Sequence, residues 1–235
     1  MKVVALLTGR GGSTLKDKNV LQICGHPLLY YPANAAKSSK HITEFYVSSD
    51  DEKILNEAYK LGYKKILRPA ELSRPDSQHI DVILHALEVM KAEGIEPDIL
   101  VVLLANAVTV KTIWINDCIE ILLADSDVSS VVPVALDSDH HPYRAKMINK
   151  EGWLEPFFDF KGLKVSTNRQ DLKPSYFLCH NFWALRVSNS IYSPKGQPPW
   201  TFMGNKIKPY IVEEAIDVHD LEDVKRAEEW VKKNT

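Results

Sequence analysis

Short apolar runs alternate with longer amphipathic segments over the first 135 residues of the chain. The run at 99–104 is continuously apolar, which is typical of a central strand buried on both faces. Other predicted strands cover 2–7, 44–48, 65–67 and 129–136. Predicted helices cover 27–39, 51–61, the region around 80–90, and 113–123. The alternation predicts an α/β fold, in which a mainly parallel, Rossmann-like sheet is flanked by helices on both faces.

The pattern changes after Leu136. Segments 140–159 and 176–187 resemble irregular strands with many aromatic residues, and 191–209 is rich in proline and glycine, which predicts a loop. Residues 220–232 then form an amphipathic pattern that predicts a closing helix. We therefore expect a single domain over 1–235, interrupted by a small β-rich insert at about 137–187.

Composition narrows the class of protein. A chain of 235 residues that is 45% hydrophobic and 26% charged fits a soluble globular domain, and its net charge of −2 predicts neither nucleic acid nor a membrane surface as a partner. The three cysteines (Cys24, Cys118 and Cys179) are widely spaced without a metal or disulfide pattern, which favours a cytoplasmic location. No apolar run reaches transmembrane length, and the first strand is too short for a signal peptide.

A loop rich in glycine and basic residues follows the first predicted strand. Glycines let a backbone approach a ligand closely, and basic side chains can surround polyphosphate oxygens. Neither GxxxxGK[ST] nor GxGxxG is present, so the loop differs from both common phosphate-binding loops. A solvated basic turn is the alternative interpretation. The residues concerned are Gly9, Arg10, Gly11, Gly12, Lys16 and Lys18.

Six motifs occur in the order and near the spacing seen in one enzyme family. They are Gly9-Arg10-Gly11-Gly12-Ser13 with Lys16, Lys18 and Asn19; Arg68-Pro69-Ala70-Glu71-Leu72, followed by His85-Ala86-Leu87-Glu88; His140-His141-Pro142 with Arg144; Arg169-Gln170-Asp171-Leu172-Lys173-Pro174; Asn181; and Ile216-Asp217 through Asp223 to Ala227-Glu228. Through them the chain resembles the acylneuraminate (CMP-sialic acid) cytidylyltransferases over nearly its whole length. The resemblance implies transfer of CMP from CTP to the anomeric hydroxyl of a nonulosonic, sialic-acid-like sugar acid, with release of pyrophosphate.

The resemblance also implies roles for individual residues. Arg10, Lys18 and Asp217 are the expected catalytic residues. Asn19 is expected either to touch the nucleoside or to hold the loop. The remaining nucleotide-binding residues are expected to be Gly11, Gly12, Ser13, Lys16, Arg68, Ser77 and His79. The acceptor is expected to be anionic and to meet Arg144, Arg169 and Asn181, although the two arginines could equally pack against a partner subunit.

Magnesium is the implied cofactor, because Mg²⁺ prefers one or two carboxylates together with phosphate oxygens and water. Asp217 is its expected ligand, and the alternative is that Asp217 only caps the last helix. His219 stands where the family has a second aspartate. It could complete the metal site, accept the proton of the attacking hydroxyl, or bind a water on the metal, although imidazole suits softer metals better.

Two further departures concern specificity. Ala105 replaces a family glutamine after the central strand, and His79 stands in place of a serine expected to contact the nucleotide. Ala105 leaves open a different anionic acceptor, such as another 2-keto-3-deoxy acid, a phosphonate or a polyol phosphate. Together with His219, it also leaves open a non-catalytic nucleotide-binding module. The aromatic residues of 140–160, together with the resemblance, predict a homodimer in which Arg144 or Arg169 approaches the neighbour's active site.

Overall fold

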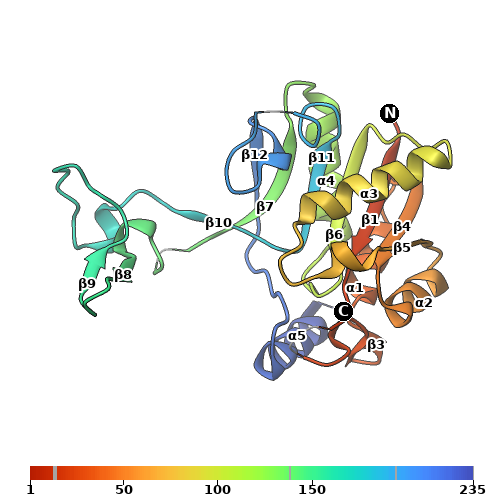
Figure 1. Cartoon of the computed structure of the whole chain (residues 1–235), viewed down its shortest axis with the longest axis horizontal. Helices are drawn as coiled ribbons and strands as arrows, with labels where there is room; N and C mark the ends of the chain where they lie inside the picture. Colours follow the sequence, from red (N-terminus) through yellow and green to blue (C-terminus); the bar gives the residue numbers. More distant parts are fainter. Residues whose placement is uncertain (13–14, 138, 194, 235) are drawn as a thin grey trace.

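The computed structural model describes residues 1–12, 15–137, 139–193 and 195–234, and its main feature is one mixed eight-stranded sheet (Figure 1). The strand order is β10-β7-β11-β6-β1-β4-β5, and β12 also pairs with β7. The strands are β1 (Val3–Thr8), β4 (Glu44–Ser49), β5 (Lys64–Leu67), β6 (Ile99–Leu104), β7 (Ser130–Leu136), β10 (Tyr176–Leu178), β11 (Phe182–Arg186) and β12 (Ile207–Ile211). The helices are α1 (Tyr30–Lys37), α2 (Glu52–Lys60), α3 (His79–Ala92), α4 (Thr112–Ala124) and α5 (Leu221–Asn234).

The predicted α/β fold with a largely parallel, helix-flanked sheet is confirmed. Strands β6, β1, β4 and β5 pair in parallel, and every residue of β1 and β6 is buried. Both faces of these strands are covered, which explains why their sequences are continuously apolar rather than alternating. Strand β11 is antiparallel to both β6 and β7, so the sheet is mixed in its second half.

Two predicted elements are wrong in detail. The helix expected over 27–39 begins only at Tyr30, because β3 (His26–Pro27) pairs with β2 (Gln22–Ile23) in a small hairpin. The predicted loop 191–209 overlaps β12, which adds to the sheet beside β7. Strand β12 contains Pro209, and proline is tolerated in a strand at a sheet edge, where its missing N–H is not needed.

Helix α5 packs away from the main core, on a second small apolar cluster. This cluster includes Ile216 and Val218 from the segment before the helix, and Ala227 and Val231 from the helix itself. The bridge between Ala107 and Asp217 joins the segment to the chain that leaves β6. The C-terminal segment is thereby brought back to the edge of the sheet, although more than a hundred residues separate the two in sequence.

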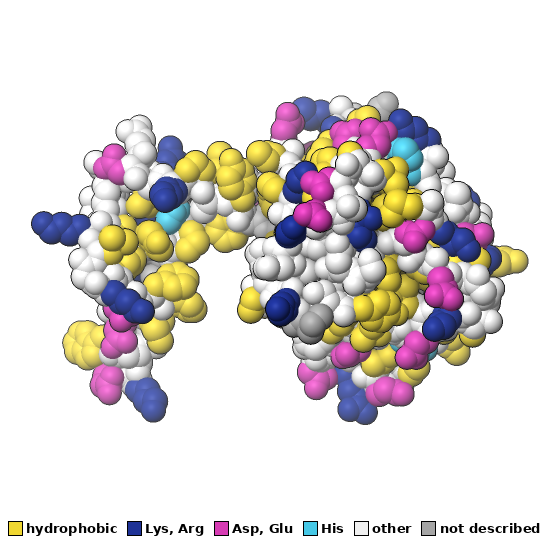
Figure 2. Space-filling view, turned by 90° about the horizontal axis from the view of Figure 1, so that it is seen from above, with side chains coloured by type: hydrophobic (Ala, Val, Ile, Leu, Met, Phe, Trp, Pro, Cys, Tyr) yellow, Lys and Arg dark blue, Asp and Glu magenta, His cyan; other side chains and the backbone are white. Residues whose placement is uncertain are grey.

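A narrow arm projects from the sheet between β7 and β10, and it carries the hairpin of β8 (Lys146–Ile148) and β9 (Leu154–Pro156) (Figure 1). Hydrophobic side chains gather along this arm and its neck (Figure 2). The insert expected at 137–187 therefore divides: its first part forms the arm, whereas β10 and β11 belong to the main sheet. We call the described residues 139–175 the arm and the rest the body.

Candidate active site

The candidate site lies where the parallel strands end. Thr8 closes β1, Ser49 closes β4 and Leu104 closes β6, and parallel pairing places these ends along one edge. Strand β11 runs the other way, so its beginning reaches the same edge, where the carbonyl of Asn181 accepts a hydrogen bond from the Leu104 amide at 3.1 Å. Ligands of open α/β sheets bind at this edge.

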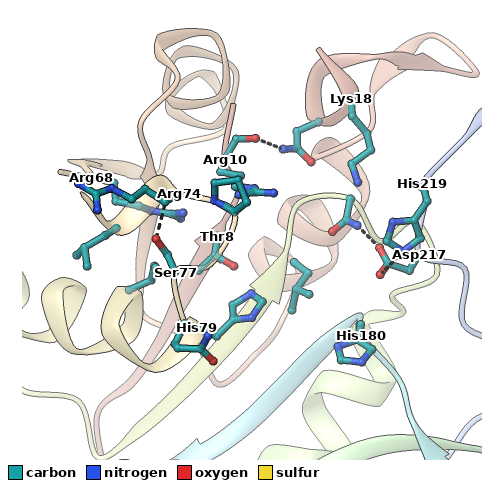
Figure 3. A pocket seen from close by; sticks show the side chains of 18 residues that line it. Thr8, Arg10, Lys18, Arg68, Arg74, Ser77, His79, His180, Asp217 and His219 are labelled. Carbon is teal, nitrogen blue, oxygen red and sulfur yellow. Dashed lines mark hydrogen bonds and ion pairs between the residues drawn. The ribbon is translucent and has the colours of Figure 1, made fainter. Parts of the chain in front are cut away.

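A cavity of about 460 Å³ opens there, with Arg10, Arg68 and Arg74 on one side and Lys18 beside Asp217 and His219 on the other (Figure 3). Eight of its lining residues are ones that the sequence predicted. These are Arg10, Lys18, Asn19, Arg68, Ser77, His79, Asp217 and His219. Residues from both ends of the chain thus meet at one place.

The glycine-basic loop is held in shape by its own contacts. The Asn19 side-chain amide donates to the Arg10 carbonyl at 3.0 Å, so Asn19 braces the loop from within the cavity wall. Lys53 pairs with Asp17 at 2.8 Å, next to Lys18. Burial lowers the pKa of Lys18, whereas the Asp217 carboxylate acts to raise it. Lys18 is itself buried and lines the cavity.

At Gly9, where the loop begins, the backbone lies close to the side chain of Ala105. A Cβ at this position would lie 2.9 Å from the Cβ of Ala105, which is shorter than side-chain carbons tolerate. Ala105 is buried against Gly9 and does not line the cavity. The position where the family has glutamine therefore serves packing in this chain.

Asp217 sits at the centre of a small polar cluster (Figure 3). Its Oδ1 accepts a hydrogen bond from the Asn106 amide, and its Oδ2 lies 3.0 Å from Nε2 of His219. Burial raises the pKa of the Asp217 carboxyl, and the nearby His219 and Lys18 act in the opposite direction. His219 is therefore a hydrogen-bond partner of the carboxylate. Within the described residues, no group of three or more His, Cys, Asp or Glu side chains is arranged to hold a metal ion.

The opposite wall carries Arg68 and His79. The Arg68 guanidinium donates to the Ser48 carbonyl at 2.7 Å and to the Ser48 hydroxyl at 3.2 Å, and burial lowers the pKa of Arg68 to about 10. The His79 side chain is exposed toward the cavity. Desolvation by the surrounding protein still lowers the pKa of its imidazole to about 4, and the charges of Arg68 and His180 act in the same direction. Arg68 is a fixed cation and His79 a neutral ring at neutral pH.

The Ser77 hydroxyl also stabilises the turn before α3 through two hydrogen bonds. It donates to the Glu71 carbonyl at 2.9 Å and accepts from the Arg74 amide at 3.0 Å. These bonds shape the turn between β5 and α3 that carries Arg74 and His79 into the cavity.

Other predicted nucleotide-binding residues lie outside the cavity lining. Lys16 and Gly12 are exposed, and the Gly11 amide donates to Asp50 Oδ1 at 3.0 Å. Ser13 lies outside the described residues. The roles suggested for these positions stay predictions.

The three acceptor residues are not brought to the cavity within one chain. Arg144 is exposed on the arm, and Arg169, also on the arm, pairs with Asp139 at 2.6 Å. Asn181 is buried, where it donates to the Thr109 carbonyl at 3.1 Å and accepts from the Phe182 amide at 2.9 Å. Asn181 thus fixes the start of β11, and the two arginines lie on the arm, outside the lining of the cavity.

The sequence analysis did not name five polar residues of the cavity lining as site residues: Thr8, Arg74, Gln78, Asn106 and His180. Thr8 and Asn106 end or follow a predicted strand, and that position alone was a usable signal. Arg74 and His180 do not follow a predicted parallel strand, so no such signal was available for them. They reach the cavity only because of how their loops fold.

Comparison with known proteins agrees with this geometry. A family model described as cytidylyltransferase matches residues 4–145, which is more than half of the chain. The chain belongs to the cytidylyltransferase family. This membership confirms the resemblance stated from the motifs.

Relatives of this cytidylyltransferase-family chain include an N-acylneuraminate and a pseudaminic acid cytidylyltransferase. An N-acylneuraminate cytidylyltransferase of Streptococcus agalactiae is 27% identical over 181 residues, which cover 75% of this chain and 41% of the relative. A pseudaminic acid cytidylyltransferase of Campylobacter jejuni is 28% identical over 178 residues, which cover 75% of both chains. The chain thus spans less than half of the streptococcal relative.

A solved structure of a CMP:2-keto-3-deoxy-manno-octonic acid synthetase complexed with CTP matches the whole chain with a TM-score of 0.69. Its sequence identity is 15%, so the match concerns the fold alone.

Proposed function

We propose that this protein is a CTP-dependent cytidylyltransferase that transfers CMP to the anomeric hydroxyl of a nonulosonic sugar acid and releases pyrophosphate. The observation that carries the proposal is the single cavity at the carboxyl edge of the sheet that Arg10, Lys18, Arg68 and Asp217 line together. Family membership over 4–145 and the names of the two relatives support the choice of CTP and of a sugar acid.

In this reaction the acceptor oxygen forms a bond to the α-phosphorus while the bond from the α-phosphorus to the bridging oxygen breaks. Pyrophosphate leaves with the electron pair, and the acceptor hydroxyl gives up its proton. Little covalent chemistry is left for the protein, so positioning and charge neutralisation supply most of the catalysis. We assign Arg10 and Lys18 to the phosphate oxygens and Arg68 and His79 to the rest of the nucleotide, and their shared position in the cavity lining supports this assignment.

Magnesium is the cofactor we propose, and the residues present fit it. Mg²⁺ is usually held by one or two carboxylates, with substrate phosphates and waters completing the shell. Asp217 offers such a carboxylate, while Asn106 and His219 orient it. A bound Mg²⁺ supplies neutralisation of the triphosphate charge.

The magnesium role is tested by Asp217→Asn, which keeps the shape of the side chain and removes its charge. We expect turnover to fall by about a hundredfold, as when one stabilising group of a transition state is lost, and to recover partly at high magnesium. Asp220→Asn is the matched control, because Asp220 Oδ1 accepts from the amides of Glu222 and Asp223 and so caps α5. Equal activity of wild type and Asp217→Asn at every magnesium concentration would reduce Asp217 to a structural role.

The activity is tested by pyrophosphate release. CTP, UTP, GTP and ATP are each offered with magnesium and with N-acetylneuraminic acid, pseudaminic acid or 2-keto-3-deoxy-manno-octonic acid. We expect release with CTP and at least one of the acids. Release only with a phosphonate or a polyol phosphate would favour the other anionic acceptors, and CTP binding without turnover would favour a non-catalytic nucleotide-binding module.

We propose a homodimer in the cytoplasm as the working form. The exposed apolar residues of the arm support association, and the position of Arg144 and Arg169 on that arm supports their approach to a neighbour's cavity. No helix in the described part of the chain has the length and apolarity to cross a bilayer. Light scattering at micromolar concentration tests the assembly: a monomer of 26.6 kDa with full activity would contradict it.

A further inference from the structure

One peptide group of the glycine-basic loop is held by side chains at both of its polar atoms. This peptide joins Arg10 to Gly11. Its carbonyl oxygen accepts a hydrogen bond from the Asn19 side-chain amide at 3.0 Å (Figure 3), and its N–H donates to Oδ1 of Asp50 at 3.0 Å. A peptide group is planar, so fixing both polar atoms fixes the plane and the backbone direction at Arg10. Asn19 comes from the same stretch of chain, whereas Asp50 comes from a different strand.

The pairing of β1 with β4 places Asp50 for this contact. The two strands run in parallel, with Thr8 opposite Ser48, and Asp50 directly follows the last residue of β4. The Gly9 amide extends the pairing by donating to the Ser48 carbonyl at 3.3 Å. The residues that follow the two strands therefore lie close together, and the side chain of Asp50 contacts the backbone of Gly11.

The turn that carries Asp50 also contacts the loop at a second point. The Asp51 carboxylate caps α2 by accepting from the Lys53 amide at 2.8 Å, which fixes the start of that helix. The Lys53 ammonium then pairs with the Asp17 carboxylate at 2.8 Å. Asp17 directly precedes Lys18. The turn after β4 thus contacts the chain next to both loop cations that line the cavity.

Gly11 and Asp50 are packed closely, but neither belongs to the described lining of the cavity. A Cβ at Gly11 would lie 3.2 Å from the Cβ of Asp51 and 3.5 Å from Oδ2 of Asp50, so a side chain here would press on the turn. At short range, Asp50 can therefore affect a bound nucleotide only through a neighbour that does line the cavity. The peptide that Asp50 holds belongs to such a neighbour, Arg10.

We propose that Asp50 is a positioning residue, which sets the direction of Arg10 toward the triphosphate by holding the Gly11 amide. This deepens the proposed function and rests on its assignment of Arg10 to the phosphate oxygens. An ionised acceptor makes a stronger hydrogen bond than a neutral one, so a carboxylate is well suited to fix the peptide. A cation that is already in place stabilises developing charge without reorganisation during the reaction.

The first test is a double-mutant cycle of Asp50→Ala and Arg10→Ala, measured as kcat/KM for CTP in the pyrophosphate-release assay. Asp50 is exposed, so its truncation should leave the melting temperature within a few degrees. Alone, Asp50→Ala should lose about tenfold, as expected for one hydrogen bond to a charged group. In the Arg10→Ala background it should cost less than about twofold, because its effect passes through Arg10. Equal factors in both backgrounds would overturn the proposal.

A charge effect on Arg68 is the competing explanation. Burial lowers the pKa of Arg68 to about 10, and the Asp50 carboxylate acts in the opposite direction. Asp50→Asn separates the two effects, because it keeps an acceptor for the Gly11 amide and removes the charge. We expect Asp50→Asn to stay within about threefold of wild type, since a neutral hydrogen bond is only moderately weaker. A loss equal to that of Asp50→Ala would assign the effect to charge and overturn the proposal.

The matched control is Glu52→Gln. Glu52 is an exposed carboxylate of the same turn, and it has no hydrogen bond or ion pair with another described residue. Removing its charge should change neither kcat nor KM. A loss as large as that of Asp50→Ala would show that any charge change in this turn has the same effect, which would contradict a specific role of Asp50.

Two further measurements do not depend on turnover. In amide NMR spectra, the Gly11 proton should move upfield in Asp50→Ala, where its acceptor is lost, and stay near the wild-type position in Asp50→Asn. An unmoved Gly11 resonance in Asp50→Ala would overturn the proposal. Calorimetry with CTP and magnesium, without an acceptor, should show weaker binding by Asp50→Ala. Tighter binding would mean that Asp50 occupies an amide that a phosphate needs, and would also overturn it.

The same data separate this proposal from the proposed function. If wild type releases no pyrophosphate but the Asp50 and Arg10 substitutions are coupled in CTP affinity, the transfer activity is refuted and the positioning role stays. If wild type and Asp50→Ala release pyrophosphate equally well, the positioning role is refuted and the function stays.

Discussion

The body buries its large apolar side chains, whereas the arm exposes them. In the body, the apolar side chains of β1 and β6 are almost fully buried, and Trp183 is 0% exposed. In the arm, Ile148 is 72% exposed, Trp153 71% and Phe157 58%. The two regions have comparable side chains, but only the body has the layers of sheet and helix that can cover them.

This contrast also separates the residues of the candidate site from the arginines that were expected to bind the acceptor. The body brings Arg10, Lys18, Arg68 and Asp217 together in the lining of one cavity. The arm holds Arg144 and Arg169 away from that cavity, on a surface that isolated monomers rarely leave uncovered. We therefore expect variants of the body to affect nucleotide chemistry, and variants of the arm to affect assembly and acceptor binding.

The largest expected effect lies in the body. Arg10→Ala should lower kcat/KM for CTP by about a thousandfold, because a positioned cation on the triphosphate is lost, while the melting temperature stays within a few degrees. Arg10→Lys should restore part of the activity. Arg169→Ala on the arm is the comparison: it should leave CTP affinity unchanged and raise only the KM for the acid. Normal pyrophosphate release by Arg10→Ala would show that the phosphate site is elsewhere.

Replacing the arm should have the next largest effect. Tyr176 pairs directly with Leu136, and the Asp137 amide donates to the Ser175 carbonyl, so the two ends of the arm are already adjacent. Substituting Asn-Gly for residues 138–174 would close a two-residue hairpin. We expect a folded monomer that binds CTP normally and retains less than about a hundredth of the transfer activity, because the acceptor is no longer held in place.

Calorimetry, light scattering and pyrophosphate release together check the arm replacement. A variant that stays dimeric, or that keeps full transfer activity as a monomer, would remove the distinction between body and arm.

A smaller effect is expected from one arm side chain. Trp153→Ser removes an exposed indole, and if the indole is an anchor of the interface the dimer dissociation constant should rise about thirtyfold. Leu67→Ser in the body is the matched control, since Leu67 is 65% exposed on β5 and should not change assembly. Sedimentation equilibrium of both variants measures the difference, and equal shifts would show that exposure alone explains the result.

The smallest expected effect concerns His79 in the body. NMR titration should give a pKa near 4 for its imidazole, so CTP affinity should show no titration of this ring between pH 6 and 8. The native pKa lies below the ordinary value of about 6.5, so the unfolded state takes up the proton first as pH falls. The contribution of His79 to the free energy of unfolding is therefore fully present above about pH 6.5 and is lost as the pH falls toward about 4. His79→Gln should lose less melting temperature on acidification, and an ordinary measured pKa would contradict the environment described here.

Much of the fold was predictable because it depends on local patterns. The apolar run 99–104 became β6 with the same bounds, and the helical spacing around 80–90 became α3. Strand β12 was missed, since its proline and short length resemble a loop until it pairs with β7. The early start predicted for α1 failed for a related reason: the pairing of His26 and Pro27 with β2 outweighs the preference of proline for a first helical turn.

The sequence motifs predicted many of the residues that line the cavity, but not the hydrogen bonds that those residues make. Asn19 and Ser77 do line the cavity, and both are also bound to the backbone of their own loops. Asn181 was expected at the acceptor and is instead buried as a brace for β11. A motif fixes identity and spacing, whereas the partner of a polar group depends on which backbone atoms the fold brings near.

The sequence alone determined the α/β class, the position of the loop rich in glycine and basic residues after β1, and the family, because these follow from periodicity and from short motifs within continuous segments. Only the tertiary structure decided that Asp217 meets Asn106 and Lys18, that Asp50 holds the Gly11 amide, and that Arg144 and Arg169 lie outside the cavity lining. These relations join residues far apart in sequence. They depend on strand order, on the antiparallel entry of β11 and on the return of the C-terminal segment, none of which leaves a local pattern in the chain.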